Sequence, residues 1–285
     1  MHPSTPMLVS EAKPTLRARL EQSDGLLLCL DFDGTLAPIA DSPTTPTITP
    51  ANERALQTLR ARTQVRLAII SGRELSDLVS RVGIPQIAYA GNHGLELADG
   101  HGVTVHPVAE RQAPSIQRAA TILETRTASI PGATVENKGL SLTLHYRQVP
   151  PARVPDVERA VESLVHGPPG QSGDGVMGQF RIVPGKQSIE IRPAVDWDKG
   201  KAVTELQRRV PDDWLTAYVG DDTTDEDAFE VLGPGDLDVF VGTDETTATY
   251  RIPAQREVAS FLRWMGRIQE TRVTGTRNRT SRTRR

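Results

Sequence analysis

Short runs of consecutive apolar residues alternate with amphipathic segments along the first third of the chain. Residues 26–30, 65–70 and 87–90 predict short strands buried on both faces. Between them, Thr49 is a candidate N-cap for one helix, and the apolar residues of 75–82 recur at the spacing of a second helix. This alternation predicts a Rossmann-like parallel α/β sheet with helices on its faces.

The middle of the chain follows a different pattern. Residues 116–123 and 157–165 predict amphipathic helices, and residues 140–147 alternate strictly, as in a strand with one solvated face. Two further strands, at 179–183 and 186–192, are predicted to be joined by a turn at Pro184-Gly185. These elements indicate a small α+β unit with an antiparallel sheet.

The parallel pattern then resumes, with a helix that opens at Lys199, strands at 215–219 and 239–241, and a closing helix over 258–265. One domain interrupted by a second fits this order. The predicted parts are an N-terminal tail (1–22), a discontinuous core (23–109 and 189–270), an inserted cap domain (110–188) and a basic, disordered tail (271–285).

The last fifteen residues contain six arginines and no acidic residue, although the chain as a whole has a net charge of −3. An electrostatic arm for nucleic acid is one reading of this tail. We favour a solvated terminus, because no aromatic residues alternate with the arginines and the rest of the chain is acidic.

Composition excludes several classes of protein. The single cysteine, Cys29, excludes an intramolecular disulfide framework and a cysteine-rich zinc site. No apolar run approaches the ~18 residues of a membrane span, and the N-terminus lacks the pattern of a secretory signal. We therefore expect a soluble, cytoplasmic protein with no membrane association.

Polar clusters follow the predicted parallel strands: Asp31 with Asp33, then Ser71, then the acidic run from Asp221. Ligands of open α/β sheets collect at this edge. Carboxylates so placed repel one another without a cation, and hard oxygen ligands suit Mg²⁺. With Mg²⁺ and Lys199 neutralising charge, one aspartate can attack phosphorus while its neighbour exchanges protons with the leaving group and water. Thr35 and Ser71 can donate hydrogen bonds to phosphate oxygens.

The motifs DFDGTL, SGR, DKGKAV and GDDTTDED resemble those of the haloacid-dehalogenase-like (HAD) phosphohydrolases with an inserted α+β cap. More specifically, DFDGTLAPI, GNHGLE, VENKGLSLTLHYR, GKQSIEIRP and GDDTTDEDAF resemble the trehalose-6-phosphate phosphatases, over about residues 26–265. The resemblance implies the following roles: Asp31 as nucleophile, Asp33 as general acid/base, Ser71 and Lys199 as phosphoryl ligands, Asp31, the main chain of Asp33 and Asp221 as Mg²⁺ ligands, and Asp222 and Asp225 as residues that orient ligands and waters.

A mixed-charge patch is predicted on the cap sheet. Lys186 and Glu190 stand an even number of residues apart on one predicted strand, so both point to its solvated face, and Arg147 lies on the solvated face of the alternating strand. A bulge at Gly139 would bring Glu136 and Lys138 to the same face. Groups of both signs suit sugar hydroxyls, which donate and accept, and a salt-bridged solvent face is the alternative. Arg73 and His93 complete the candidate substrate-binding set, although a structural role for His93 is equally compatible with its turn; His145 and Trp197 are interpreted as structural.

Together these features predict a Mg²⁺-dependent phosphatase that converts trehalose 6-phosphate to trehalose and phosphate through an aspartyl phosphate. The alternatives are a HAD-type phosphatase for another sugar phosphate (sucrose 6-phosphate or a hexose phosphate), a phospho-aspartate signalling module and a silent regulatory homologue. A signalling module needs about half of the 285 residues, and intact Asp31, Asp33, Lys199 and Asp221 argue against a silent homologue. The expected partner is a small sugar phosphate, with a possible functional link to a trehalose-phosphate synthase.

Overall fold

The computed structural model describes residues 5–39, 46–166, 180–185 and 187–282, and the chain divides into two compact units. Unit 1 comprises Met1–Thr104 and Trp197–Arg285, and unit 2 comprises Val105–Asp196. Unit 2 therefore extends beyond the predicted insertion of 110–188. At the C-terminal boundary the difference arises from the strand Ser188–Pro193, which the prediction divides between the two domains. In the structure the whole strand pairs with strands of unit 2.

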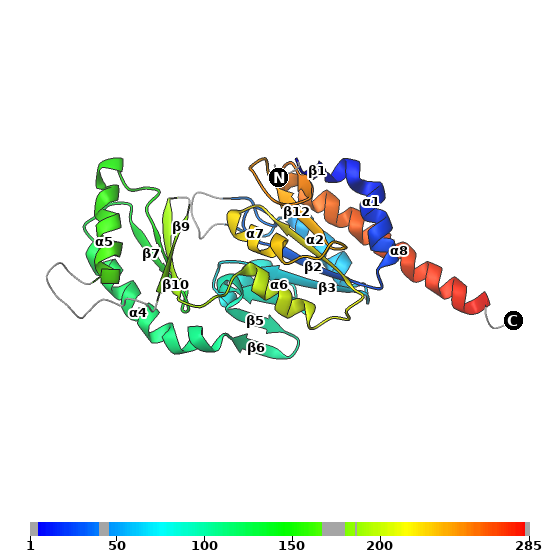
Figure 1. Ribbon diagram of the computed structural model, residues 1–285, viewed down its shortest axis with the longest axis horizontal. Coiled ribbons are helices and arrows are strands. Elements are labelled where there is room, and N and C mark those ends of the chain that lie inside the picture. The colour runs from blue at the N-terminus through cyan, green and yellow to red at the C-terminus, as the bar shows by residue number, and fades with distance from the viewer. Residues whose placement is uncertain (1–4, 40–45, 167–179, 186, 283–285) are drawn as a thin grey trace. The chain divides into compact units, whose positions relative to one another are not determined.

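Unit 1 is built on a nine-stranded sheet (Figure 1). Its strands are parallel from the first to the seventh position of the order, and β5 returns antiparallel to β4. The order is β1 (Met7–Leu8), β13 (Tyr250–Ile252), β12 (Leu237–Val241), β11 (Leu215–Gly220), β2 (Leu26–Asp31), β3 (Val65–Ile70), β4 (Ala88–Gly91), β5 (Glu96–Asp99) and β6 (Gly102–Val105). The predicted parallel α/β sheet is confirmed, with β2 at its centre.

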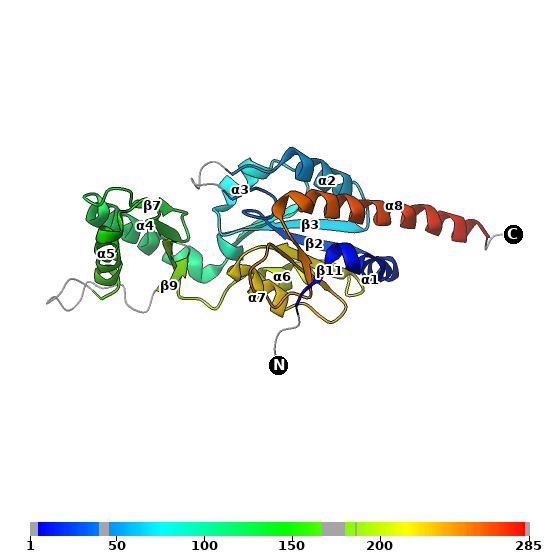
Figure 2. The same cartoon turned by 90° about the horizontal axis from the view of Figure 1, so that it is seen from above.

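Helices cover both faces of this sheet, since alternate residues of the central strands enter two separate apolar clusters. Leu28 belongs to the cluster shared with α1 (Val9–Gln22), α2 (Pro50–Arg60), α3 (Leu75–Val82) and α8 (Val258–Arg282). Cys29, on the opposite face, belongs to the cluster shared with α6 (Lys199–Gln207) and α7 (Thr223–Glu230). Figure 2 shows β2 and β3 between α2 and α8 on one side and α6 and α7 on the other.

Both predicted tails contain regular structure. The N-terminal segment forms β1 and α1, and α1 buries Val9, Ala12, Leu16 and Leu20 in the core of unit 1. The prediction of a tail at 1–22 is therefore wrong for residues 7–22. Helix α8 likewise continues to Arg282, so the structure has helix where disorder was predicted for 271–282.

Unit 2 is a four-stranded antiparallel sheet covered on one face by two helices. The order is β7 (Thr134–Asn137), β8 (Leu142–His145), β10 (Ser188–Pro193) and β9 (Phe180–Gly185), and the helices are α4 (Pro107–Thr127) and α5 (Val154–His166). Leu142, Leu144 and Ile191 pack against these helices.

Two details of unit 2 differ from the prediction. Strand β9 continues through Pro184-Gly185, and Gln187 rather than Gly185 adopts a positive φ (59°) where the chain reverses. Gly139, with φ of 75°, lies in the turn between β7 and β8 instead of forming a bulge.

Within the described ranges, no helix combines the length and the apolar character that crossing a bilayer requires.

Candidate active site

The ammonium group of Lys199 lies at the centre of a buried ionic cluster in unit 1. Lys199 occupies the first turn of α6, which Asp198 caps by accepting a hydrogen bond from the N–H of Lys201. Lys199 Nζ donates to Asp31 Oδ1 and to Asp225 Oδ1, both at 2.7 Å. All three side chains are at most 6% exposed. The structure thus brings together three parts of the chain that the sequence analysis assigned to one site.

Asp225 uses both of its carboxylate oxygens to organise this cluster. Oδ1 accepts from Lys199 Nζ and from the hydroxyl of Tyr218 at 2.6 Å, and Oδ2 accepts from the N–H groups of Asp221 and Asp222 at 2.9 Å. Asp222 is the N-cap of α7, and its own carboxylate completes a capping box. A carboxylate offers about four acceptor positions, so Asp225 has none left for a metal ion.

Asp221 approaches the loop after β2. Its Oδ1 accepts a hydrogen bond from the hydroxyl of Thr35 at 3.2 Å. The sequence predicts that this hydroxyl donates to phosphate, whereas in the structure it donates to a carboxylate. Gly34 has a φ of 83°, and a Cβ there would lie 1.9 Å from Asp221 Oδ2. Only glycine permits this approach.

The cluster has more negative charge than Lys199 can balance. Carboxylate oxygens of Asp31, Asp221 and Asp225 lie within 4.8 Å of one another. Burial, together with the neighbouring carboxylates, raises the pKa of Asp31 well above its ordinary range and that of Asp221 to about 7. Burial alone would lower the pKa of Lys199, but the ion pairs with Asp225 and Asp31 outweigh it and raise that pKa. The deficit of positive charge and the hard oxygen donors fit a divalent cation such as Mg²⁺.

Arg73 holds the carboxylate of Asp33 in a bidentate pair. Arg73 Nε and one terminal nitrogen donate to the two oxygens of Asp33 at 2.7 Å, and the other terminal nitrogen donates to Asp77 Oδ2 at 3.0 Å. The guanidinium also stacks 5.5 Å above the ring of Phe32. The sequence predicts a substrate-binding role for Arg73, whereas in the structure its guanidinium donates to two aspartates of unit 1.

Ser71, in the loop that follows β3, lies against His93, in the segment that follows β4. Ser71 is buried, and its Oγ accepts from the N–H of Arg73 at 3.2 Å. His93, in the short 3₁₀ turn η1 (Asn92–Gly94), has a φ of 59° and donates its N–H to the carbonyl of Ser71. A Cβ at Gly72 would lie 2.5 Å from His93 Nε2, so the ring packs directly on this loop.

The predicted patch of unit 2 is partly assembled. Lys138 Nζ lies 3.3 Å from Glu190 Oε1, and Glu136 Oε2 lies 2.7 Å from His145 Nε2. Glu136 and Glu190 flank Thr143 on adjacent strands, on the face opposite α4 and α5. Two predicted members differ: Arg147 is exposed in a turn beyond the end of β8, and Lys186 lies outside the described residues.

Sequence reasoning missed three participants. Tyr218 reads as one more apolar position of a buried strand, and nothing in the pattern marked it as polar. Asp77, in the first turn of α3, stands four residues after Arg73, and this spacing could have revealed the pair. Arg192, whose Nε donates to Glu190 Oε2 at 2.8 Å, shares the parity of Glu190 along β10.

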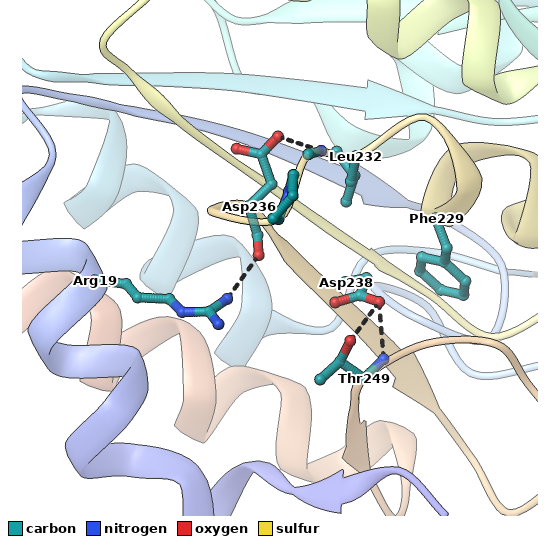
Figure 3. Close-up of a pocket in the computed structure, with 8 residues that line it drawn as sticks. Arg19, Phe229, Leu232, Asp236, Asp238 and Thr249 are labelled. Atoms are coloured by element: carbon teal, nitrogen blue, oxygen red, sulfur yellow. Dashed lines mark hydrogen bonds between the residues drawn. The ribbon is translucent and has the colours of Figure 1, made fainter. Parts of the chain in front are cut away.

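A separate cavity of about 250 Å³ lies beside the start of β12 (Figure 3). Its acidic groups already serve the fold. Asp236 accepts from the N–H groups of Thr216 and Gly233, and Asp238 accepts from the N–H and hydroxyl of Thr249. Arg19 donates to the main-chain carbonyl of Asp236. The cavity therefore offers no reactive arrangement that competes with the Lys199 cluster.

Comparison with known proteins identifies the family. The family model described as trehalose-phosphatase matches residues 29–253. The chain is 38% identical over 268 residues to the trehalose-phosphate phosphatase of Mycobacterium marinum, a match that covers 89% of this chain and 65% of that protein. The chain thus spans about two thirds of the length of this relative.

Solved structures share the fold. The C-terminal domain of Candida albicans trehalose-6-phosphate phosphatase superposes with a TM-score of 0.74 at 24% identity, covering 93% of this chain and 99% of that one. A haloacid dehalogenase-like hydrolase from Bacteroides thetaiotaomicron superposes with a TM-score of 0.57 at 15% identity, covering 84% and 98%. At these identities the likeness concerns the fold alone, a parallel α/β core with a second, α+β unit.

Proposed function

Because the chain belongs to the trehalose-phosphatase family, we propose that it hydrolyses trehalose 6-phosphate to trehalose and inorganic phosphate. The observation that carries the proposal is the buried cluster in which Lys199 bonds Asp31 and Asp225 at 2.7 Å. Phosphate monoesters are among the slowest substrates to react unaided, so a site for them must combine a nucleophile, an acid and fixed positive charge.

Asp31 is the proposed nucleophile. Its Oδ1 is oriented by Lys199, and Oδ2 is the oxygen we assign to attack on phosphorus. The new bond joins Oδ2 to phosphorus, and the bond from phosphorus to the sugar oxygen breaks, which leaves an aspartyl phosphate. Lys199, and Ser71 in the adjacent loop, are the proposed partners of the phosphoryl oxygens.

Asp33 is the proposed general acid and base. As the acid it gives a proton to the departing sugar oxygen, and as the base it takes one from the water that opens the aspartyl phosphate. Its bidentate pair with Arg73 fixes the orientation of this carboxylate within unit 1. The pair of Asp31 and Asp33 distinguishes the site from a signalling module that only accepts a phosphoryl group.

The carboxylates of Asp31 and Asp221 and the main-chain carbonyl of Asp33 would hold Mg²⁺, which supplies charge neutralisation for the phosphate oxygens. Asp225 and Asp222 orient these groups, since Asp225 is fully hydrogen-bonded within the protein.

Recognition of the sugar is assigned to the polar face of unit 2. Its members are Glu136, Lys138 and Glu190, with Arg147 and Lys186 as further candidates. We also propose a cytoplasmic location, in keeping with the single, buried, unpaired Cys29, and a functional link to a synthase that makes the substrate.

The test is phosphate release from a panel of sugar phosphates with and without Mg²⁺. Trehalose 6-phosphate should be the preferred substrate, activity should require the metal, and Asp31→Asn should release no phosphate, because an amide cannot form the acyl phosphate. A preference for sucrose 6-phosphate or glucose 6-phosphate would contradict the assigned sugar and leave the chemistry intact.

A further inference from the structure

Tyr218 is a buried polar group that the proposed chemistry does not use. It lies on β11, is fully buried, and donates its hydroxyl to Asp225 Oδ1 at 2.6 Å. Burial and the neighbouring carboxylate of Asp225 raise its pKa well above the ordinary value, so the hydroxyl keeps its proton and remains a donor.

The hydroxyl continues a linear set of contacts that ends at the nucleophile. Tyr218 donates to the same Asp225 oxygen that receives Lys199 Nζ, and Lys199 donates in turn to Asp31. Gly220 makes this geometry possible, because a Cβ there would lie 2.3 Å from Asp225 Cγ. The carboxylate of Asp225 thus packs against Gly220 at the end of β11, and the hydroxyl of Tyr218 on the same strand holds it there.

We propose that Tyr218 is a positioning residue for the phosphoryl-transfer site. Its hydroxyl fixes Asp225 Oδ1, and Asp225 thereby fixes the ammonium of Lys199 beside Asp31. The inference rests on the proposed phosphatase activity and adds a residue to it. Without the hydroxyl, Asp225 Oδ1 retains one partner instead of two, so Lys199 can follow the carboxylate away from the position that the reaction needs.

The test compares Tyr218→Phe with Tyr89→Phe. Tyr89 is the matched control because it lies on β4 of the same sheet and is buried. Among the described residues, its hydroxyl contacts the main chain of Ile84 alone, at 2.7 and 3.1 Å. Both substitutions keep the ring and remove one buried hydroxyl. An aryl phosphate is the substrate, so sugar recognition does not enter the measurement.

For Tyr218→Phe we expect kcat to fall about tenfold, the size of one lost hydrogen bond to a charged group. KM and the Mg²⁺ concentration for half-maximal rate should stay within about twofold of the wild type. Tyr89→Phe should lower the melting temperature about as much as Tyr218→Phe does, but should leave kcat unchanged.

Three results would overturn the inference: a kcat for Tyr218→Phe equal to that of Tyr89→Phe, a loss of rate that excess Mg²⁺ restores, or failure of Tyr218→Phe alone to fold, which would assign the hydroxyl to stability. A wild-type protein that cleaves the aryl phosphate and rejects trehalose 6-phosphate contradicts only the proposed substrate. One that cleaves neither contradicts both proposals.

Discussion

Gly34 controls how closely the loop after β2 approaches Asp221. An alanine at this position would have to adopt a φ of 83° and would place its methyl group 1.9 Å from Asp221 Oδ2. We expect Gly34→Ala to weaken Mg²⁺ binding at least tenfold, because one ligand would be displaced. Calorimetric titration of the metal checks this.

Gly83→Ala is the control for backbone strain alone. Gly83 ends α3 with a φ of 64°, and a Cβ there meets nothing within 4 Å. This variant should lose about 1–2 kcal/mol of stability and keep its Mg²⁺ affinity. Unchanged affinity in Gly34→Ala as well would remove Asp221 from the metal site.

Single positions were predictable where the pattern places a residue at the end of an element. Asp31, Ser71, Lys199 and Asp221 lie at the strand ends and helix start where they are predicted, because such boundaries follow from hydrophobic periodicity. The direction of a long side chain does not follow from periodicity, so Arg73 was assigned to substrate although it binds Asp33. The contact of Tyr218 with the site could not be predicted, because its ring packs in the core and only its hydroxyl reaches Asp225.

At the scale of elements, α3 is stabilised at its exposed side by a carboxylate between two arginines. Asp77 Oδ2 accepts from Arg73 at 3.0 Å and from Arg81 Nε at 2.6 Å, and Arg81 also donates to the carbonyl of Pro46. Burial opposes ionisation of Asp77, but the hydrogen bonds from Arg81 and Arg73 outweigh it and lower its pKa.

The lowered pKa fixes the sign of a pH effect. A carboxyl that binds its proton less readily in the folded state stabilises the fold above the ordinary aspartate pKa and loses this contribution as the pH falls through its folded value. Asp77→Asn should therefore destabilise the protein at pH 7, by under about 1 kcal/mol given its exposure. The difference should shrink in acid. Urea unfolding across pH measures it, and a difference that is constant with pH would contradict this account.

Unit 2 permits a test of specificity separate from chemistry. Glu190 and Lys138 contact each other on the polar face, at 3.3 Å. Glu190→Ala or Lys138→Ala should lower kcat/KM for trehalose 6-phosphate about 5- to 150-fold, if each lost partner is worth roughly 1–3 kcal/mol. Hydrolysis of an aryl phosphate should remain near the wild-type rate. Equal loss of both activities would assign the pair to folding.

Elements with continuous apolar runs were predicted well, and terminal or short elements were not. Strand β3 and helix α3 have the predicted bounds, since each combines a clear period with a clear stop. Helix α1 was missed because Pro14 and frequent charged residues obscure its apolar stripe. The stripe can be recognised only once its residues are seen packed in the core of unit 1. The β9–β10 reversal was misplaced because Pro184-Gly185 is a strong turn signal that the sheet of unit 2 overrides.

At the scale of the whole molecule, each unit has its own hydrophobic core. We expect two unfolding transitions, of which Mg²⁺ raises only that of unit 1, because a ligand stabilises the domain that binds it. All three tryptophans, Trp197, Trp214 and Trp264, belong to unit 1, so their fluorescence follows that unit while circular dichroism follows both.

A control for this prediction is Leu142→Ala in the core of unit 2. It should lower the free energy of unfolding of unit 2 by about 2–5 kcal/mol. The transition of unit 1, which fluorescence follows, should stay in place. A single transition that shifts as a whole with Mg²⁺ would mean that the two units unfold together.

The central pairing of β2 with β11 joins two ends of the chain across the whole of unit 2. On the ribosome, β2 emerges long before β11, and Lys199 follows Asp31 by 168 positions. During synthesis unit 2 has all of its strands before unit 1 has its central partner. The nascent chain therefore carries one open edge of the largely apolar β2, whose other edge pairs with β3, until the C-terminal third is made. This interval is when chaperone binding or aggregation would compete with folding.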